Sequence, residues 1–373
     1  MKKIRILHLL SALELTNGVA SYVMNHYDEL DHDKFKVDFL IVKTADQKYI
    51  DKIEKNQDEI IYGPKLTLKN YGAFKKHAKK LFEERTYDIV HSHEFNWGMP
   101  YLKEAKKKHI PIRIFHAHLT LSSPKRLNRI RNAFLIPISL RASNTFFSCS
   151  MVAGKYFFKQ KPFYLAHNAI DTEKYMFNIE HRKDIRKLLN ISDTEKLIGF
   201  FGRFEHQKNP MFTLKVFQEL SQRDESVKLL LVGNGYLEQN ILNFIDQMNL
   251  KDRVIVLSPR RDIYKFYSAI DLFMLPSLFE GLPVVGVEAL FSNLPQVYST
   301  EITKELNLNQ MITYLDLKEP VSNWVLAIEN IFEKPNDRVH FNLDNLKVYD
   351  IRHQGKVIME KYIELLEEVN HGR

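Results

Sequence analysis

Short apolar runs rich in β-branched residues recur along the chain, and segments with helical periodicity separate them. Runs of about four to eight apolar residues are typical of buried strands, whereas apolar residues three or four apart indicate amphipathic helices. Helical patterns include residues 211–222 and 237–249. Strands are predicted for "KIRILHLL", "KVDFLIV", "YDIVHSH" and "PIRIFHAH" in the first half and for "KLIGFFGR", "VKLLLVGNG", "RVIVLS" and "IDLFMLPS" in the second. This alternation predicts an α/β fold with helices packed on parallel sheets.

The polar segment between residues 168 and 195 interrupts this alternation near the middle of the 373-residue chain. We therefore predict two Rossmann-like, doubly wound domains, residues 1–170 and 171–352, followed by a charged amphipathic helix at about 353–373. Doubly wound sheets bind ligands at the carboxyl ends of their strands. Two such domains are expected to face each other across a cleft.

Charge is distributed unevenly along the chain. Residues 1–170 contain 29 Lys and Arg against 16 Asp and Glu, a formal charge of +13, whereas the remainder carries −5. Such an asymmetry suggests an anionic partner for the first domain, either nucleic acid or an anionic membrane surface. The single cysteine, Cys149, fits a reducing compartment.

The first residues, "MKKIRILHLLSALE", imitate a signal peptide, but His8 interrupts a short apolar run and no convincing cleavage site follows. No stretch approaches the roughly 18 apolar residues that a membrane-spanning helix needs. A cytoplasmic protein is expected, soluble or peripheral on the inner face of the membrane.

Two carboxylates bracket a Gly-Leu-Pro turn in "LFEGLPVVGVEAL", residues 278–290. Glu280 follows a predicted strand, and Glu288 lies about five residues into a helix predicted to begin at Pro283. Gly281 allows close backbone approach, and the free amides at the helix start form an anion site. A phosphate site between two carboxylates that can accept hydrogen bonds from hydroxyl groups is the pattern expected for a bound nucleotide sugar. The alternative is the acid pair of a glycosidase.

The cations that such a ligand needs are found in "FFGRFEHQKNP", residues 200–210. A predicted strand ends at Gly202, and Arg203 and Lys208 follow in the loop. This arrangement suits a pyrophosphate, because Arg offers a planar fork and Lys a point charge. The alternative for this segment alone is a pair of solvated surface cations.

Four segments in order resemble the retaining glycosyltransferases of family 4, which have the GT-B fold and use nucleotide-sugar donors. The most specific is E-x7-E with Gly-Leu-Pro after Glu280. "GRFEHQKNP" is similar to the family's G-R-x-x-x-x-K-N segment, "LVGNG" to its V-G-x-G turn, and "LSPRRDI" to its L-G-x-R-x-D-V run. The resemblance covers nearly the whole chain and implies that the final helix packs back on the first domain.

The resemblance also implies roles for individual residues in the second domain. Arg203 and Lys208, next to Gly202, would bind the donor diphosphate and stabilise it as leaving group. Glu288 would accept hydrogen bonds from the ribose. Glu280 would hold the sugar hydroxyls with help from the amides of Gly281 and Leu282, and Arg260 to Ile263 would lie against the base.

In the first domain, the resemblance implies that His116 in "IFHAHL" reaches the transferred sugar, and His118 remains an alternative. His91, His93 and His118 are candidates for the acceptor side, as is Asn17, and Gly18 would present its amide to the donor phosphate or to the acceptor. For each histidine, an ordinary structural role remains equally open. "LELTNGVASYVMN" departs from the family by placing Asn17-Gly18 where paired glycines are usual, which leaves the acceptor preference open.

The expected function is retaining transfer of a hexose-type sugar from a UDP-sugar to a lipid-linked saccharide, for capsule or exopolysaccharide biosynthesis. No Asp-x-Asp or metal-ligand cluster is visible, so the reaction is expected to need neither metal nor cofactor and to resist EDTA. Basic amphipathic segments at 69–85 and 124–141 could contact anionic membrane.

Two alternatives belong to other classes. A nucleic-acid-binding protein on an α/β scaffold would use the basic first domain, but neither a recognisable module nor interleaved aromatic residues support it. A nicotinamide dehydrogenase would need G-x-G-x-x-G after the first strand, and the sequence lacks it.

Overall fold

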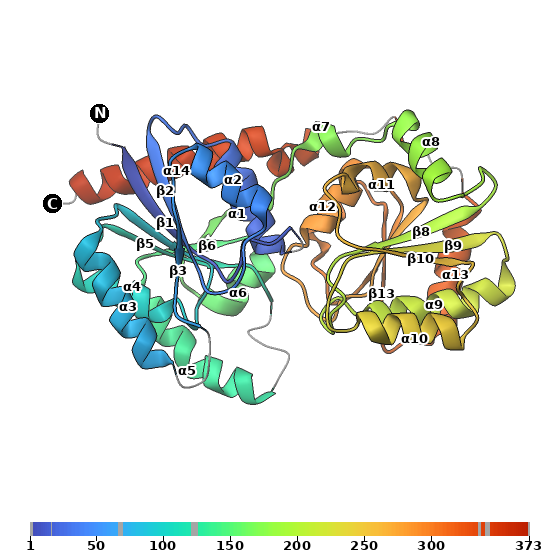
Figure 1. The fold of residues 1–373 in the computed structure, drawn as a ribbon, viewed down its shortest axis with the longest axis horizontal. Coiled ribbons are helices and arrows are strands. Elements are labelled where there is room, and N and C mark those ends of the chain that lie inside the picture. Colours follow the sequence, from blue (N-terminus) through green and yellow to red (C-terminus); the bar gives the residue numbers. More distant parts are fainter. Residues whose placement is uncertain are drawn as a thin grey trace. The chain divides into compact units, whose positions relative to one another are not determined.

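The computed structural model describes residues 3–15, 17–65, 70–120, 126–334, 337–339 and 344–371. The chain divides into two compact units, which are described separately below (Figure 1). Unit 1 comprises Met1–Ala169 and Ile351–Arg373, and unit 2 comprises Ile170–Asp350. Each unit has one parallel sheet with helices around it, so the predicted fold class is confirmed.

Unit 1 contains a seven-stranded parallel sheet in the order β3-β2-β1-β4-β5-β6-β7. The order reverses at β1, which lies between β2 and β4, as expected of a doubly wound sheet. Its elements are β1 Ile4–Leu9, α1 Gly18–Asp28, β2 Phe35–Ile41, α2 Gln47–Lys55, β3 Ile60–Tyr62, α3 Tyr71–Glu84, β4 Ile89–Ser92, α4 Met99–Lys107, β5 Ile112–Ala117, α5 Arg126–Ala142, β6 Thr145–Ser148, α6 Met151–Phe158, β7 Tyr164–Leu165 and α14 Ile351–His371.

The two faces of this sheet have separate cores, because successive strand residues point to opposite sides. On β1, Ile6 packs with residues of α1 and α14, whereas Leu7 and Leu9 pack with residues of α3 and α4. In Figure 1 these two pairs of helices cover opposite faces of the sheet. Because the side chains on both faces of β1 are buried, the predicted strand is apolar at almost every position.

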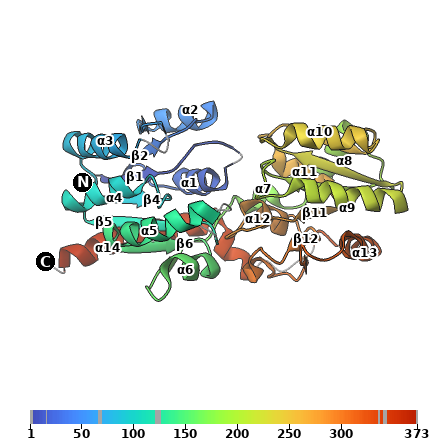
Figure 2. The same cartoon turned by 90° about the horizontal axis from the view of Figure 1, so that it is seen from below.

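Helix α14 follows unit 2 in the sequence but belongs to unit 1, along which it lies in Figures 1 and 2. Ile358, Tyr362 and Leu365 occur one turn or two turns apart and are buried in the same core as Ile6. Gly355 meets Glu29, and a Cβ at this glycine would lie 2.5 Å from the Glu29 Cβ. The helix is therefore an integral part of the unit's core.

Unit 2 has a six-stranded parallel sheet in the order β10-β9-β8-β11-β12-β13. Helices α9, α10 and α13 lie on one side of it and α8, α11 and α12 on the other (Figure 1). Its elements are α7 Thr172–Tyr175, α8 Ile179–Leu188, β8 Lys196–Phe201, α9 Pro210–Arg223, β9 Val227–Val232, α10 Glu238–Gln247, β10 Val254–Leu257, α11 Ile263–Ala269, β11 Leu272–Leu275, α12 Val284–Phe291, β12 Gln296–Ser299, η1 Lys304–Leu306, β13 Ile312–Leu315, α13 Val321–Phe332 and η2 Asp344–Tyr349.

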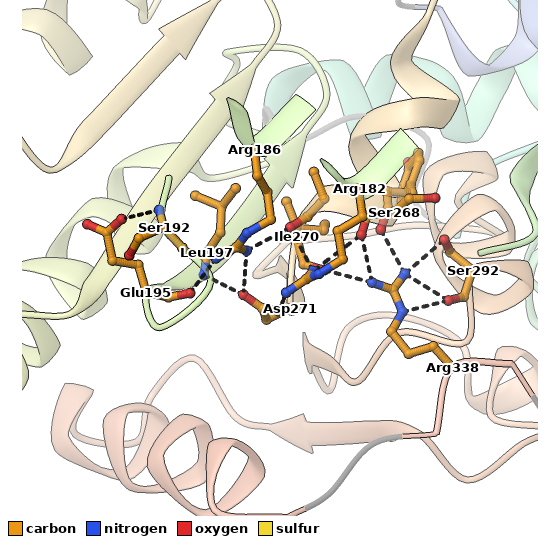
Figure 3. A network of polar contacts seen from close by, with 12 residues as sticks. Arg182, Arg186, Ser192, Glu195, Leu197, Ser268, Ile270, Asp271, Ser292 and Arg338 are labelled. Atoms are coloured by element: carbon orange, nitrogen blue, oxygen red, sulfur yellow. Dashed lines mark hydrogen bonds and ion pairs between the residues drawn. The ribbon is translucent and has the colours of Figure 1, made fainter. Parts of the chain in front are cut away.

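A network of charged side chains holds the amino-terminal edge of this second sheet (Figure 3). Asp271 immediately precedes β11, and its carboxylate accepts from the Leu197 amide at 2.8 Å and pairs with Arg182 at 2.7 Å and Arg186 at 3.2 Å. Arg338 donates to the carbonyl oxygens of residues 267, 268, 270 and 292. These arginines satisfy backbone groups that would otherwise be buried without partners.

Candidate functional site

The predicted phosphate-binding loop lies at the opposite, carboxyl-terminal edge of the sheet in unit 2. Strand β8 ends at Phe201, and Gly202 follows with φ +150°, a conformation that L side chains rarely adopt. Lys208 lies beside this glycine, since a Cβ placed there would be 3.7 Å from its Cδ. The next helix, α9, begins at Pro210. The glycine thus lets the chain turn directly from the strand into the cationic loop.

Both cations of this loop have acidic or amide partners. Lys208 Nζ lies 2.7 Å from Glu280 Oε1, and this pair is almost entirely buried. Arg203 is more exposed and donates to Glu205 at 2.7 Å and to Gln207 at 3.3 Å. The structure therefore joins the two predicted segments, 200–210 and 278–290, through the Lys208–Glu280 pair. A lysine ammonium has three donors, so the pair leaves further hydrogen-bonding capacity for a phosphate.

Helix α12 begins one residue later than predicted. It spans Val284–Phe291, and Pro283 is its N-cap with an extended backbone, so the prediction that Pro283 is the first helical residue is wrong. The reason is its ψ of 124°, which lies outside the helical region even though its φ of −68° is compatible with a helix. A proline N-cap has no side-chain acceptor for the first amides, unlike the usual Ser, Thr, Asp or Asn. The helix start therefore retains backbone donors next to the buried residues Glu280 and Leu282.

Glu288 is the fifth residue of α12, as the sequence indicated. Its carboxylate accepts hydrogen bonds from Tyr267 at 2.6 Å and from Tyr175 at 2.9 Å. Burial raises the pKa of Glu288, while the hydroxyls of Tyr267 and then Tyr175 act in the opposite direction. A carboxylate offers about four acceptor positions, and these two phenols occupy two of them. The side chain is held in place and retains capacity for further hydroxyl groups.

The predicted base-binding segment lies at the start of α11. Arg260 forms an ion pair with Asp262 at 2.9 Å and lies over the ring of Phe266, and Ile263 is the first residue of the helix. The hydrogen bond to Asp262 raises the pKa of Arg260. Arg260 is thus a fixed, permanently charged group at the helix start.

In unit 1, the loop after β1 leads into α1. Gly18 is the first residue of that helix, and Asn17 is its N-cap, whose Oδ1 accepts from Val19 N at 3.0 Å and from Ala20 N at 3.2 Å. The structure thus gives Asn17 a local role in starting the helix, in addition to the predicted role in binding the acceptor substrate.

The histidines of unit 1 form one cluster because of their spacing and the sheet order. Residues two apart in an extended chain share a face, which places His91 with His93 and His116 with His118, where His93 and His118 directly follow β4 and β5. His8 of β1 is the register partner of His91, and β4 and β5 are neighbours. All five side chains therefore meet on the face that α1 covers, where Tyr22 contacts the rings of His93, His116 and His118.

The rings of this cluster are connected by two chains of hydrogen bonds. In one, Tyr362 Oη lies 2.7 Å from His91 Nδ1, and His91 Nε2 lies 3.0 Å from His116 Nδ1. In the other, His8 Nδ1 lies 3.0 Å from His93 Nε2, and His93 Nδ1 lies 2.8 Å from His118 Nε2. Both ring nitrogens of His91 and of His93 are therefore engaged within the protein. These two residues support His116 and His118 and offer no further ring nitrogen to a ligand.

All rings of the cluster are neutral at physiological pH. Burial lowers the pKa of His8 and His118 to about 3, with the charge of His26 as a smaller cause. Burial also lowers the pKa of His91, His93 and His116 well below the usual value, and neighbouring histidines reinforce this. Each neutral imidazole carries one N–H donor and one acceptor.

Sequence reasoning missed this cluster as a unit. It found no metal-ligand set, yet the described residues include two histidine triads, His8/His91/His93 and His93/His116/His118, in which one nitrogen of each ring lies within 4.8 Å of the others. It also missed His8, Tyr22 and Tyr362, and in unit 2 the phenols of Tyr175 and Tyr267. The H-x-H spacings on two predicted strands were the available signal, but the contribution of Tyr362 depends on tertiary packing.

A pocket of about 650 Å³ opens beside the arginine network of unit 2, at the amino-terminal edge of its sheet. Its wall includes Arg182, Asp271 and Arg338, which already bind one another or backbone carbonyls. None of the residues predicted to bind the donor lines it. The pocket is therefore distinct from the loop that contains Arg203 and Lys208.

Comparison with known families agrees with this geometry. Residues 16–174 match the family model described as Glycosyltransferase Family 4, and residues 181–339 match the model described as Glycosyl transferases group 1. The chain belongs to the family 4 glycosyltransferases of GT-B fold and is an enzyme of the glycosyltransferase class.

Individual relatives support the same conclusion. The chain is similar to glycosyltransferase EpsF of Bacillus subtilis (28% identity; 99% of this chain and 98% of the relative), and to an Escherichia coli galactosyltransferase named for UDP-Gal and α-D-GlcNAc-diphosphoundecaprenol (24%; 80% and 79%). It is also similar to CapH of Staphylococcus aureus, named for capsular polysaccharide biosynthesis (25%; 76% and 79%). Among solved structures, HepE of Anabaena in complex with UDP-glucose has the same fold, with a TM-score of 0.72 at 17% identity over 99% of both chains.

Proposed function

We propose that this enzyme transfers a hexose-type sugar, with retention of anomeric configuration, from a UDP-sugar to a lipid-linked saccharide during synthesis of a surface polysaccharide. The buried Lys208–Glu280 pair carries this proposal, because it brings the cationic loop and the two-carboxylate loop together at one edge of the sheet in unit 2. That edge is where doubly wound sheets bind nucleotides. The names of the Escherichia coli and Staphylococcus aureus relatives support a lipid-linked acceptor and a surface polysaccharide.

Charge separation in the reaction accounts for the residues at this edge. As the sugar–phosphate bond breaks, the sugar becomes oxocarbenium-like and the diphosphate gains negative charge. Lys208 and Arg203 bind the diphosphate, together with the amides at the start of α12, and stabilise this charge where it develops. Glu280 orients Lys208 and accepts from the sugar hydroxyls, Glu288 accepts from the ribose, and His116 contacts the transferred sugar.

We attribute retention to attack on the same face from which the diphosphate leaves, with a donor phosphate oxygen taking the acceptor proton. Glu280 is paired with Lys208 at 2.7 Å and Glu288 is held by two phenols, so neither carboxylate resembles an unencumbered nucleophile. The anomeric configuration of the product tests this step by NMR. An inverted product would contradict it.

The reaction is proposed to need no metal, because Arg203 and Lys208 supply the positive charge that a divalent ion supplies in other transferases. Turnover is expected to be unchanged after EDTA treatment and dialysis. A requirement for added Mg²⁺ or Mn²⁺ would contradict the role given to these two side chains.

Membrane contact is proposed for α5 rather than α3. The apolar stripe of α3, which includes Phe74, Ala78 and Leu81, is buried in the core of unit 1. On α5, by contrast, Ile130 and Phe134 are 61% and 72% exposed, beside Arg131. Apolar side chains flanked by cations suit the surface of an anionic bilayer. None of the described helices has both the length and the apolar character needed to span a membrane.

Calorimetric titration with UDP, GDP and their sugars tests the donor site. We expect one nucleotide to bind wild-type protein and to bind Lys208→Ala at least about tenfold more weakly, because a charge-assisted hydrogen bond is lost. Lys215→Ala is the matched control, since this lysine is exposed on α9. Equal binding to wild type and Lys208→Ala would contradict the proposed site.

A further inference from the structure

The hydrogen-bond chain that ends at His116 has a direction, and the phenol of Tyr362 on α14 determines it. The chain consists of Tyr362 Oη, the two nitrogens of His91 and Nδ1 of His116, with separations of 2.7 and 3.0 Å. At its end, His116 Nε2 is buried and has no hydrogen-bond partner among the described residues. A buried ring nitrogen without a partner is costly unless a ligand satisfies it.

The direction follows from the protons available. Burial raises the pKa of Tyr362, so its hydroxyl stays protonated, and a buried hydroxyl needs an acceptor. His91 Nδ1 is the acceptor that lies within reach of it in the described part of the chain. Because neutral His91 then carries its proton on Nε2, it donates to His116 Nδ1. Neutral His116 must in turn carry its proton on Nε2.

We propose that Tyr362 is a positioning residue that fixes His116 as the Nε2–H tautomer through His91, so that His116 presents a hydrogen-bond donor and not a base. The partner of this N–H is an oxygen atom of the sugar, an assignment that rests on the proposed function. His116 then stabilises bound sugar without removing a proton from the acceptor. This agrees with an attack in which the donor phosphate takes that proton.

The same rings could instead hold a metal ion, since His93, His116 and His118 form a triad within 4.8 Å. The hydrogen bonds argue against this, because His93 uses one nitrogen for His8 and the other for His118. A metal would need a lone pair from each ligand, so coordination through His93 would displace one of these two hydrogen bonds. Metal coordination requires bare ring nitrogens, whereas the observed hydrogen bonds already use these nitrogens as donors or acceptors.

Heteronuclear NMR of the full-length protein with ¹⁵N-labelled histidine tests the proposal without substrate, because protonated and bare ring nitrogens give well-separated signals. His116→Gln assigns the His116 signals by their disappearance. We expect the Nε2–H tautomer in wild type and in His91→Gln, whose amide can accept from Tyr362 and donate to His116. In Tyr362→Phe, we expect the Nδ1–H tautomer to become populated.

Tyr87→Phe is the matched control. The Tyr87 hydroxyl donates to Asp38 at 2.7 Å, so this variant loses an equally short, buried hydrogen bond in the core on the other face of the sheet. It should leave the His116 tautomer unchanged. In assays of transfer, Tyr362→Phe should lower kcat about three- to tenfold at constant donor KM, as expected for one weakened hydrogen bond.

Three results would overturn the proposal: an Nδ1–H tautomer in wild type, an unchanged tautomer in Tyr362→Phe, or stoichiometric zinc bound by these rings in the purified protein. If the tautomers behave as expected but no UDP-sugar is used, the proposed function fails while the hydrogen-bond chain stands.

Discussion

The two units contain largely buried polar networks of opposite character. In unit 2, Asp271, Arg182, Arg186 and Arg338 are charged, lie at the amino-terminal edge of the sheet and bind one another or backbone carbonyls. In unit 1, the histidine cluster is neutral, lies at the carboxyl-terminal edge and leaves His116 Nε2 without a partner among the described residues. A network closed on itself maintains the fold, whereas the network proposed above to end in the Nε2–H donor of His116 is suited to a ligand.

Removing one charge from the network of unit 2 should give the largest effect on stability. Asp271→Asn leaves Arg186, which is 2% exposed, with an uncompensated buried charge. We expect the free energy of unfolding to fall by about 3–5 kcal/mol, measured by urea denaturation. Glu219→Gln is the control, because its pair with Arg223 is partly exposed and should contribute less than about 1 kcal/mol. Similar losses in both variants would remove the basis for calling this network structural.

At the opposite edge of the same sheet, loss of a cation should affect turnover more than folding. Lys208→Ala is expected to lower kcat about 10²–10³-fold, because a preorganised donor to the leaving group is lost. Steady-state transfer assays measure this, with Lys215→Ala as the control. A Lys208→Ala enzyme with nearly normal kcat would show that the loop does not bind the diphosphate.

Acid should destabilise unit 1 through its histidines. The folded pKa of His8 is about 3, below the value of about 6.5 for an unfolded chain, so the unfolded state binds more protons between these limits. The contribution of this ring is complete well above pH 6.5, begins to decrease near that value, and at lower pH falls by about 1.4 kcal/mol per pH unit toward pH 3.

Unfolding free energies measured at pH 6.5 and 5.5 test this prediction. His8→Asn can keep the hydrogen bond to His93 but cannot titrate. The free energy of unfolding of this variant should therefore fall by about 1 kcal/mol less than that of the wild type between pH 6.5 and 5.5. An identical pH dependence in wild type and His8→Asn would indicate that the ring is solvated and not buried.

The smallest effect is expected on the surface, where neither network is involved. Phe134→Ser should weaken sedimentation with phosphatidylglycerol-containing vesicles about three- to tenfold, because a largely exposed ring is no longer available for insertion. Tyr62→Ser is the control, since Tyr62 is also exposed on unit 1 but lies on β3. Equal losses in both variants would argue against α5 as the membrane-contacting face.

The sequence predicted the fold class and the positions of the loops that contain Lys208 and Glu280, because these depend on local signals. Long apolar runs indicated β1, β2, β4 and β5 in unit 1 and β8 to β11 in unit 2, and the spacing from Glu280 to Glu288 indicated a strand, loop and helix. The strands that were not predicted, β3, β6, β7, β12 and β13, have two to four residues. Runs this short carry little periodicity and are recognised mainly by composition. The predicted four-residue strands β10 and β11 are wholly apolar, whereas β6 and β12 begin and end with polar residues.

The histidine network could not be derived in the same way. The spacing of His91 and His93 predicts a shared face, but which strands are neighbours depends on the sheet order. Tyr362 lies 271 residues from His91, and the hydrogen bond between them only becomes possible when α14 packs on unit 1. Similarly, the prediction that α12 starts at Pro283 failed because its φ suited a helix but its ψ did not.

The position of α14 has a consequence for biosynthesis. The ribosome completes Met1–Ala169 long before it makes Ile358 and Tyr362, because all of Ile170–Asp350 is translated in between. Until then, the nascent first unit exposes the apolar surface that α14 later covers, and His91 lacks its phenol. Unit 2 can therefore mature first, although it is encoded second, and the core and histidine cluster of unit 1 are completed only after α14 has been translated.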